Sequence, residues 1–202
     1  MNIIDSSSLD KTFAQNDSGL INLPLFEVKP VKYQLQKTEI ENVIFQSRNS
    51  VNFFEDFDCL KGKRVFAMGE GTRLSLKEMG VSSIVPNKPG SAGLIEFLKS
   101  NNYDANTLIV KGKHGLNIVR DELERMGHKV IEAECYERER LSSYTKLKLD
   151  YAAADAIVFT SCFSVQIYLE ELHASDSKAK LFGISKRICD YAKDIGLQII
   201  EI

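Results

Sequence analysis

Turns that combine glycine with hydroxyl groups are the parts of this sequence best suited to chemistry. Gly69-Glu70-Gly71-Thr72 stands between an expected strand and an expected helix. There the backbone N–H groups and the helix dipole favour an anion. A dinucleotide fingerprint would need a third glycine where Leu74 stands, and no acidic ribose ligand follows. The turn is therefore a candidate anion site, and a tight β-α turn that uses glycine for its backbone freedom is the plain alternative.

Two lysines follow another expected strand. Gly112-Lys113-His114 is similar to part of a phosphate loop, but Thr107 stands at the first glycine and His114 at the magnesium-binding hydroxyl. ATP binding is therefore not expected. Lys111 and Lys113 are candidates to bind a carboxylate at the carboxyl end of the strand, where ligands gather in open α/β sheets. Solvated turn lysines are the alternative.

Serine and tyrosine hydroxyls supply further candidates. Ser47 and Ser161 each close an expected strand and open the helix that follows. Each hydroxyl can cap its helix or bind a ligand oxygen. Tyr136 lies on a segment expected to be extended, where it would face a cleft, unless its ring simply packs at a hinge.

Composition and spacing exclude several classes of function. The 202 residues are 44% hydrophobic and carry 26 Lys and Arg against 28 Asp and Glu. Such a chain can bury a core, and its near neutrality argues against nucleic-acid and anionic-membrane partners. No signal peptide or bilayer-spanning run is visible, so we predict a cytoplasmic protein. The histidines lie far apart and the four cysteines form no C-x-x-C pair, so no metal site is expected.

The candidates sit in a pattern of β-α units around parallel sheets, because short apolar runs alternate with segments of helical period. Strands are expected at 2–5, 42–45, 64–68, 82–85, 107–110, 129–133, 156–159, 181–184 and 197–202. Helices are expected at 72–80, from Ser91 onwards, at 165–172, at 188–195 and from Leu116 to Met126. The last of these should end at Gly127 as a left-handed cap.

The pattern repeats, which predicts two similar lobes. Val43-Ile44-Phe45-Gln46-Ser47-Arg48-Asn49-Ser50-Val51 is echoed by Ile157-Val158-Phe159-Thr160-Ser161-Cys162-Phe163-Ser164-Val165. A second echo, between residues 74–81 and 190–197, follows in the same order. We expect a discontinuous outer lobe of residues 1–19 plus 140–202 and an inserted central lobe of residues 36–128. Two extended crossings, residues 20–35 and 129–139, would join the lobes.

In the order of these motifs the sequence resembles the uroporphyrinogen-III synthase family along almost the whole chain. The resemblance lies in the segments 23–30, 43–51, 66–73, 108–113, 135–138 and 157–161, which are similar to the family's proline-containing crossing, strand ends, glycine-x-x-threonine turn and tyrosine-bearing crossing. It implies a bilobal α/β enzyme that binds hydroxymethylbilane, a flexible chain with eight carboxylates. The family removes the terminal hydroxyl as water, inverts ring D and closes the macrocycle in heme biosynthesis, without a cofactor or metal.

The resemblance also implies roles for individual residues. Tyr136 and Thr72 match the family's catalytic hydroxyl residues, with Tyr136 as the candidate proton donor to the departing hydroxyl. The expected substrate-binding residues are Ser47, Gly71, Lys111, Lys113, Ser161, Ser185 and Arg187. In the outer lobe Ser185 stands at the glycine and Ile188 at the threonine of the corresponding turn, so a hydroxyl used by the family is missing there.

Two alternatives remain open beside the enzyme. A non-catalytic two-lobed binding protein or sensor of the same fold would keep the sheets and lose the chemistry, and a nucleotide-dependent α/β enzyme would bind NAD or ATP. We expect the protein to work as a monomer.

Overall fold

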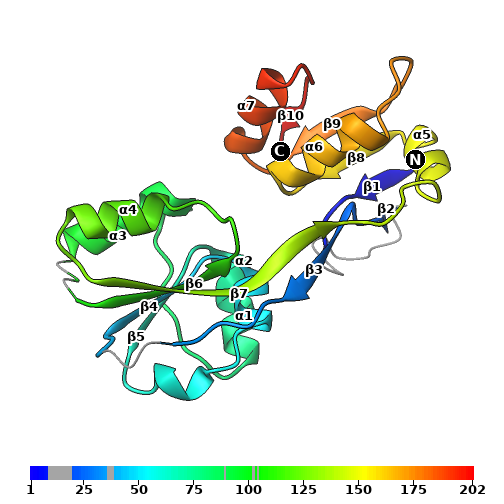
Figure 1. The fold of residues 1–202 in the computed structure, drawn as a ribbon. Coiled ribbons are helices and arrows are strands. Elements are labelled where there is room, and N and C mark those ends of the chain that lie inside the picture. Colours follow the sequence, from blue (N-terminus) through cyan, green and yellow to red (C-terminus); the bar gives the residue numbers. More distant parts are fainter. Residues whose placement is uncertain (9–19, 36–38, 89, 102, 104) are drawn as a thin grey trace. The chain divides into compact units, whose positions relative to one another are not determined.

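The chain forms two compact units. The structure, a computed structural model, describes residues 1–8, 20–35, 39–88, 90–101, 103 and 105–202. The first unit is discontinuous and comprises Met1–Glu27 and Glu139–Ile202, whereas the second is the continuous stretch Val28–Arg138 (Figure 1). The chain passes from one unit to the other within β3 (Phe26–Pro30) and again within β7 (Val130–Arg140). The predicted boundaries after residue 19 and at residue 36 fall outside the described residues.

The second unit is built on a five-stranded sheet in the order β3-β7-β6-β4-β5. Its inner strands are β7, β6 (Thr107–Gly112) and β4 (Asn42–Phe45), and its edge strands are β3 and β5 (Arg64–Ala67). The pairs β4–β5, β4–β6 and β6–β7 are parallel. The strand expected at 82–85 was wrong, because this segment makes an isolated bridge between Ile84 and Phe66, and the fifth strand is β3.

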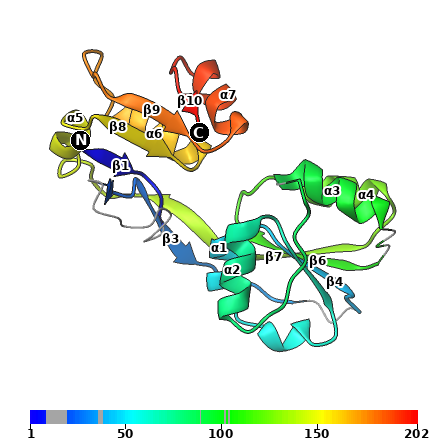
Figure 2. The same ribbon diagram turned by 180° about the vertical axis from the view of Figure 1, so that it is seen from behind.

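Helices cover both faces of this sheet (Figure 2). One face packs against α1 (Arg48–Asn52) and α2 (Glu70–Glu78), whose Val51 and Leu76 share a core with Phe45 and Val110. The other face packs against α3 (Gly90–Ser100) and α4 (Ile118–Arg125). Because both faces are buried, residues 43–45 of β4, 65–67 of β5 and 108–110 of β6 are continuously apolar. A short 3-10 helix, η1, spans Phe57–Leu60.

The first unit has its own five-stranded sheet, in the order β10-β9-β8-β1-β2. The strands are β1 (Ile3–Asp5), β2 (Leu20–Asn22), β8 (Ala156–Phe159), β9 (Lys180–Gly183) and β10 (Ile200–Glu201), and their neighbours all pair in parallel. Residues 20–22, expected in a crossing, thus belong to this sheet. The helices are α5 (Lys148–Ala152), α6 (Cys162–Glu171) and α7 (Lys186–Asp194). The predicted α/β class with two parallel sheets flanked by helices is confirmed.

The carboxyl ends of three helices follow the glycine turns of the sequence, whereas several helices begin at other residues than expected: α3 begins at Gly90, α6 at Cys162 and α7 at Lys186. Gly127 has φ 87° and ends α4 as a left-handed cap, and Gly80 and Gly196 do the same for the echoed helices α2 and α7. However, α2 begins at Glu70 rather than Thr72, because Gly69 serves as its N-cap. Leu116 precedes α4 and is exposed, so its expected place in the apolar stripe was wrong.

Leu108→Ala should destabilise the second unit strongly, because Leu108 is fully buried on the central strand β6 and its removal leaves a cavity. We expect a loss of about 2–5 kcal/mol in the free energy of unfolding. Leu74→Ala is the matched control, because Leu74 on α2 is 47% exposed and should cost less than about 0.5 kcal/mol. Urea titration of both variants measures the difference, and equal losses would contradict this description of the core.

Candidate functional site

Parallel pairing gathers the candidate residues of the second unit at one edge of its sheet. The strands β4, β5, β6 and β7 run in the same direction, so their carboxyl ends meet at that edge. Ser47 follows β4, the turn from Gly69 to Thr72 follows β5, and Lys113 follows β6. Tyr136 pairs with Gly112 at the end of β6. Ligands of open α/β sheets bind at such an edge.

A hydroxyl pair forms the centre of this edge. The Ser47 Oγ and Tyr136 Oη atoms are 2.9 Å apart. Ser47 is the N-cap of α1, and its Oγ accepts the backbone N–H of Ser50 at 3.0 Å. Tyr136 is 4% exposed, and its ring lies 6.0 Å from that of Phe53. The structure therefore brings together two residues that the sequence separates by almost ninety positions.

The start of α2 adjoins the hydroxyl pair. The N-cap of this helix is Gly69, which has no side chain to accept the N–H groups of the first turn. Thr72 lies in that turn, is 5% exposed, and its hydroxyl bonds to no residue among those described. The Arg48 side chain lies against Gly71, where an added Cβ would be 3.3 Å from the Arg48 Nε atom.

Arg48 was not among the site residues predicted from the sequence. It directly follows Ser47 and makes no ion pair within the described part of the chain, whereas Arg73 is bonded to Glu70. Arg48 is the first residue of α1, and its side chain lies against Gly71 in the first turn of α2. Helix starts carry partial positive charge, so a bound anion would stabilise this cation and both helix starts. The place of Arg48 directly after a strand-end serine is the signal that could have identified it.

Lys111 is buried on the other side of the sheet. Its ammonium donates to Asn117 Oδ1 at 2.5 Å and to Glu132 Oε1 at 2.9 Å, and its side chain is 2% exposed. Ile109, two residues earlier on β6, packs in the core beneath α4, whereas Tyr136 belongs to the core beneath α1. The structure thus gives Lys111 a protein carboxylate as partner and separates it from the hydroxyl pair.

Lys113 lies close to Tyr136 through the backbone. Its N–H donates to the Tyr136 carbonyl at 2.7 Å, and its ammonium pairs with Glu137 at 3.2 Å. Both side chains of this pair are partly exposed, so the pair contributes about 0–1 kcal/mol and can open for another carboxylate.

The first unit repeats the arrangement at the carboxyl ends of β8 and β9. Ser161 caps α6, and its Oγ accepts the Ser164 N–H at 3.1 Å. Ser185 begins α7 without a side-chain capping bond. Arg187 approaches the neighbouring turn, with its Nη1 atom 3.4 Å from Cys162 Sγ, and makes no ion pair with any described residue. Ile188 is buried against β9, in place of the threonine of the second unit.

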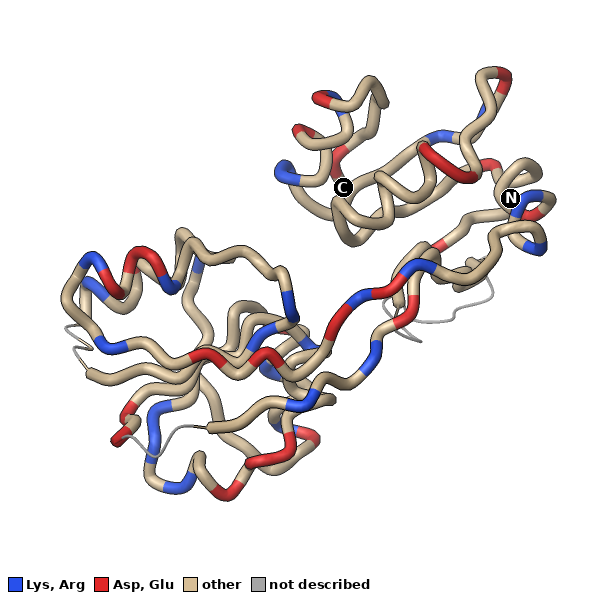
Figure 3. Tube along the Cα trace, viewed as in Figure 1, with Lys and Arg blue, Asp and Glu red and all other residues tan. Residues whose placement is uncertain are grey.

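The chemistry of these edges is that of hydroxyls and cations. Burial raises the pKa of Cys135, the residue before Tyr136, to about 12, so this thiol stays protonated at neutral pH and is a poor nucleophile. Among the described residues, no group of three or more His, Cys, Asp or Glu side chains is placed to hold a metal ion. Lys and Arg positions are interspersed with Asp and Glu positions along the chain of both units (Figure 3), without the clustering of basic residues typical of nucleic-acid-binding proteins.

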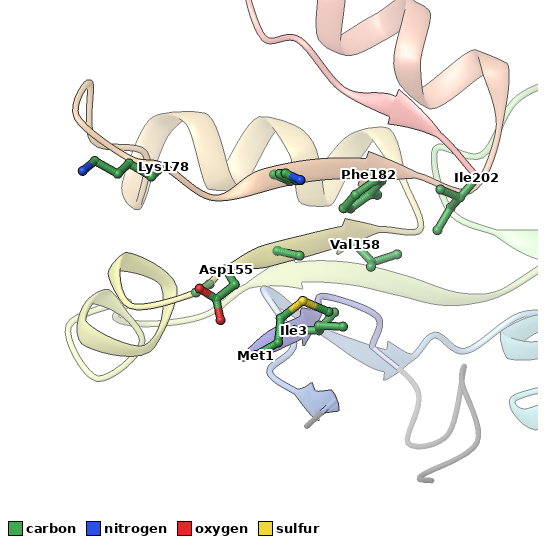
Figure 4. A pocket seen from close by; sticks show the side chains of 10 residues that line it. Met1, Ile3, Asp155, Val158, Lys178, Phe182 and Ile202 are labelled. Carbon is green, nitrogen blue, oxygen red and sulfur yellow. The ribbon is translucent and has the colours of Figure 1, made fainter. Parts of the chain in front are cut away.

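A hollow of about 800 Å³ in the first unit lies away from these groups. It is lined by Met1, Ile3, Ala154, Asp155, Ala156, Val158, Lys178, Lys180, Phe182 and Ile202 (Figure 4). Most of the lining comes from the amino-terminal ends of β1, β8 and β9, opposite the end that carries Ser161 and Ser185. The hollow is also largely apolar, so it is not the expected place for a carboxylate-rich ligand.

Two parallel-sheet units, each with a serine-capped helix and an arginine without an ion pair at the carboxyl edge, define a two-unit α/β protein suited to an anionic ligand. The sequence matches the model of the family described as uroporphyrinogen-III synthase HemD over residues 7–202. The chain belongs to this family and is an enzyme of tetrapyrrole biosynthesis. None of the helices in the described ranges is long and apolar enough to cross a membrane.

Solved structures share the fold. A uroporphyrinogen-III synthetase from Helicobacter pylori has 16% sequence identity and a TM-score of 0.72, with 99% of this chain and 91% of that chain covered. A mutant uroporphyrinogen III synthase from Thermus thermophilus has 13% identity and a TM-score of 0.62, with 100% and 92% covered. No curated protein sequence matched the chain. Neither the family match nor these two structures support the alternative of a non-catalytic binding protein or sensor.

The two strand-end serines of the first unit should differ in their contribution to stability. Ser161→Ala removes the acceptor for the Ser164 N–H and should cost about 0.5–2 kcal/mol. Ser185→Ala removes no capping bond and should stay within about 0.5 kcal/mol of wild type. Urea unfolding of the two variants is the measurement, and equal losses would show that the capping assignment is wrong.

Proposed function

We propose that the chain cyclises hydroxymethylbilane to uroporphyrinogen III with loss of water and inversion of ring D, and that the carboxyl edge of the second unit's sheet holds the reacting end. Family membership over residues 7–202 supports the reaction. The observation that carries the placement is the hydroxyl pair of Ser47 and Tyr136 beside Arg48, which has no ion pair among the described residues.

Carboxylate binding is divided among backbone and side-chain groups. In the second unit the Arg48 guanidinium, the Thr72 hydroxyl and the N–H groups at Gly71 are the proposed donors. In the first unit they are Arg187 and the hydroxyls of Ser161 and Ser185. Bonds from an arginine to carboxylates are charge-assisted and about twice as strong as neutral ones. A flexible polyanion held at several points loses the freedom to close in the wrong way.

Proton donation is the proposed task of Tyr136. Departure of the terminal hydroxyl as water needs a proton at that oxygen, and a phenol at hydrogen-bond distance can supply it. The near-complete burial of Tyr136 keeps bulk water from the donor. Lys113 is proposed to bind a carboxylate when its exposed pair with Glu137 opens. Lys111 is already paired with Glu132, so we assign it to holding β6, β7 and the start of α4 together.

The cellular compartment and the partners are proposed from the composition and from the state of the cysteines. All four cysteines, Cys59, Cys135, Cys162 and Cys189, are free thiols. We therefore propose the cytoplasm, where thiols stay reduced. The net charge of −2 and the interspersed basic and acidic residues along the chain do not favour nucleic acid. We propose a monomer, because one chain contains every group of the site.

A coupled assay that generates hydroxymethylbilane in situ tests the function. We expect the wild-type protein to direct the product to the type III ring, and Tyr136→Phe to lower kcat by about 10²–10⁴-fold because the proton donor is lost. Thr72→Ala should also slow turnover, and both variants should keep the wild-type unfolding midpoint within a few degrees. Formation of the type I ring alone by wild type would reject the function. A wild-type rate in both variants would reject the site.

Arg48→Gln tests the carboxylate site separately. Loss of a charge-assisted bond should raise KM by about 10-fold or more and leave kcat within about three-fold. The matched control is Arg73→Gln, since Arg73 is exposed and bonded to Glu70, and its KM should not change. An equal KM for Arg48→Gln and wild type would contradict the assignment.

A further inference from the structure

The position of Tyr136 depends on an irregularity in β7. Ile131, Ala133 and Cys135 alternate into the core beneath α1, so a regular strand would point the next side chain to the opposite face. Instead Lys111 pairs with Glu134 and Gly112 pairs with Tyr136, which leaves Cys135 as an extra residue. Such a bulge re-aims a side chain and is rare in parallel sheets. Here it turns Tyr136 into the same core as Cys135.

Gly112 opens the path that the tyrosine takes. β6 lies between β7, which carries Tyr136, and β4, which is followed by Ser47. The phenol ring must therefore pass over β6 to reach Ser47. A Cβ at Gly112 would lie 2.5 Å from the ring carbon Cζ of Tyr136 and 2.9 Å from its hydroxyl oxygen. Glycine is needed at this crossing because any side chain would displace the ring.

Ser47 is held so that its proton can point to Tyr136. The Ser47 Oγ atom accepts the Ser50 N–H, while the Ser50 hydroxyl bonds to the Ser47 carbonyl at 2.6 Å. A serine hydroxyl has one proton and two lone pairs. With one lone pair occupied by the Ser50 N–H, the proton of Ser47 is available for the Tyr136 oxygen at 2.9 Å. When Ser47 donates in this bond, Tyr136 keeps its own proton for a ligand.

We propose that Ser47 is a positioning residue that acts through Tyr136 and does not itself bind substrate in the reacting step. This inference rests on the function proposed above. Ser47 donates to the Tyr136 oxygen and directs the phenol proton to the departing hydroxyl. The proton passes from Tyr136 to that oxygen, the C–O bond breaks with its electron pair leaving in water, and the pyrrole nitrogen lone pair forms the new double bond. The Tyr136 phenolate accepts the Ser47 hydrogen bond until the proton released by the pyrrole at ring closure returns to it.

A double-mutant cycle in the full-length protein tests the role. Ser47→Ala should lower kcat about 10-fold and change KM less than two-fold. In the Tyr136→Phe background the same substitution should lower kcat by less than about a further two-fold, because the effect of Ser47 passes through the phenol. Ser47→Thr keeps the hydroxyl and should restore most of the lost kcat. Ser47→Asp keeps a good helix cap but cannot donate to the phenol, so its kcat should be as low as that of Ser47→Ala.

The matched control for folding is Ser50→Ala, which removes the other side chain of the capping box but keeps the N–H. We expect a lower unfolding midpoint and a kcat within two-fold of wild type. The positioning role would be overturned if the losses of kcat from Ser47→Ala and Tyr136→Phe multiplied in the double mutant, or if Ser47→Ala raised KM at constant kcat. Either result would leave the synthase function intact. Exclusive type I product from wild type would overturn both.

Discussion

The parallel pairing of β4, β5, β6 and β7 is the constraint on which the second unit's site depends. Parallel strands place their carboxyl ends side by side, so the turns that follow them converge although they are far apart in sequence. β4 lies near the middle of the sheet, and both faces are covered by helices. The helix starts at Ser47 and Gly69 are therefore fixed by a buried core. The same core that determines stability also sets the positions of the hydroxyl groups.

Duplication explains why the two units look alike and yet differ in chemistry. Ser47 and Ser161 occupy the same place, each as the extended N-cap of a helix that follows a buried strand. In the second unit Thr72 supplies a hydroxyl after the neighbouring strand, whereas in the first unit Ile188 fills that place and packs on Gly183. An apolar side chain there strengthens the core and removes one donor. The start of α7 therefore lacks the hydroxyl that Thr72 supplies in α2. Among the described residues, the Ser161 hydroxyl bonds to Ser164 and not to a tyrosine.

Periodicity and turn chemistry made much of this fold predictable from sequence. The strand at 156–159, the left-handed cap at Gly127 and the serine turns were expected from local signals, because burial on both faces and positive φ leave clear traces. The strand expected at 82–85 failed because its apolar residues make a single bridge, and the real fifth strand, β3, comes from distant sequence. The partners of Lys111 could not be predicted from the sequence either, because Glu132 and Asn117 contact Lys111 only through tertiary packing.

The bulge at Tyr136 shows why site geometry resists prediction more than site composition. Alternation in β7 would assign Tyr136 to the face of Glu132 and Glu134, and a single extra residue reverses this assignment. The reversal works only with glycine on the adjacent strand, since the ring occupies the space that a side chain of residue 112 would need. Two features that each weaken a sheet, a bulge and a glycine, are thus required together by one hydroxyl contact. Stability alone does not explain their combination, whereas delivery of a phenol to Ser47 does.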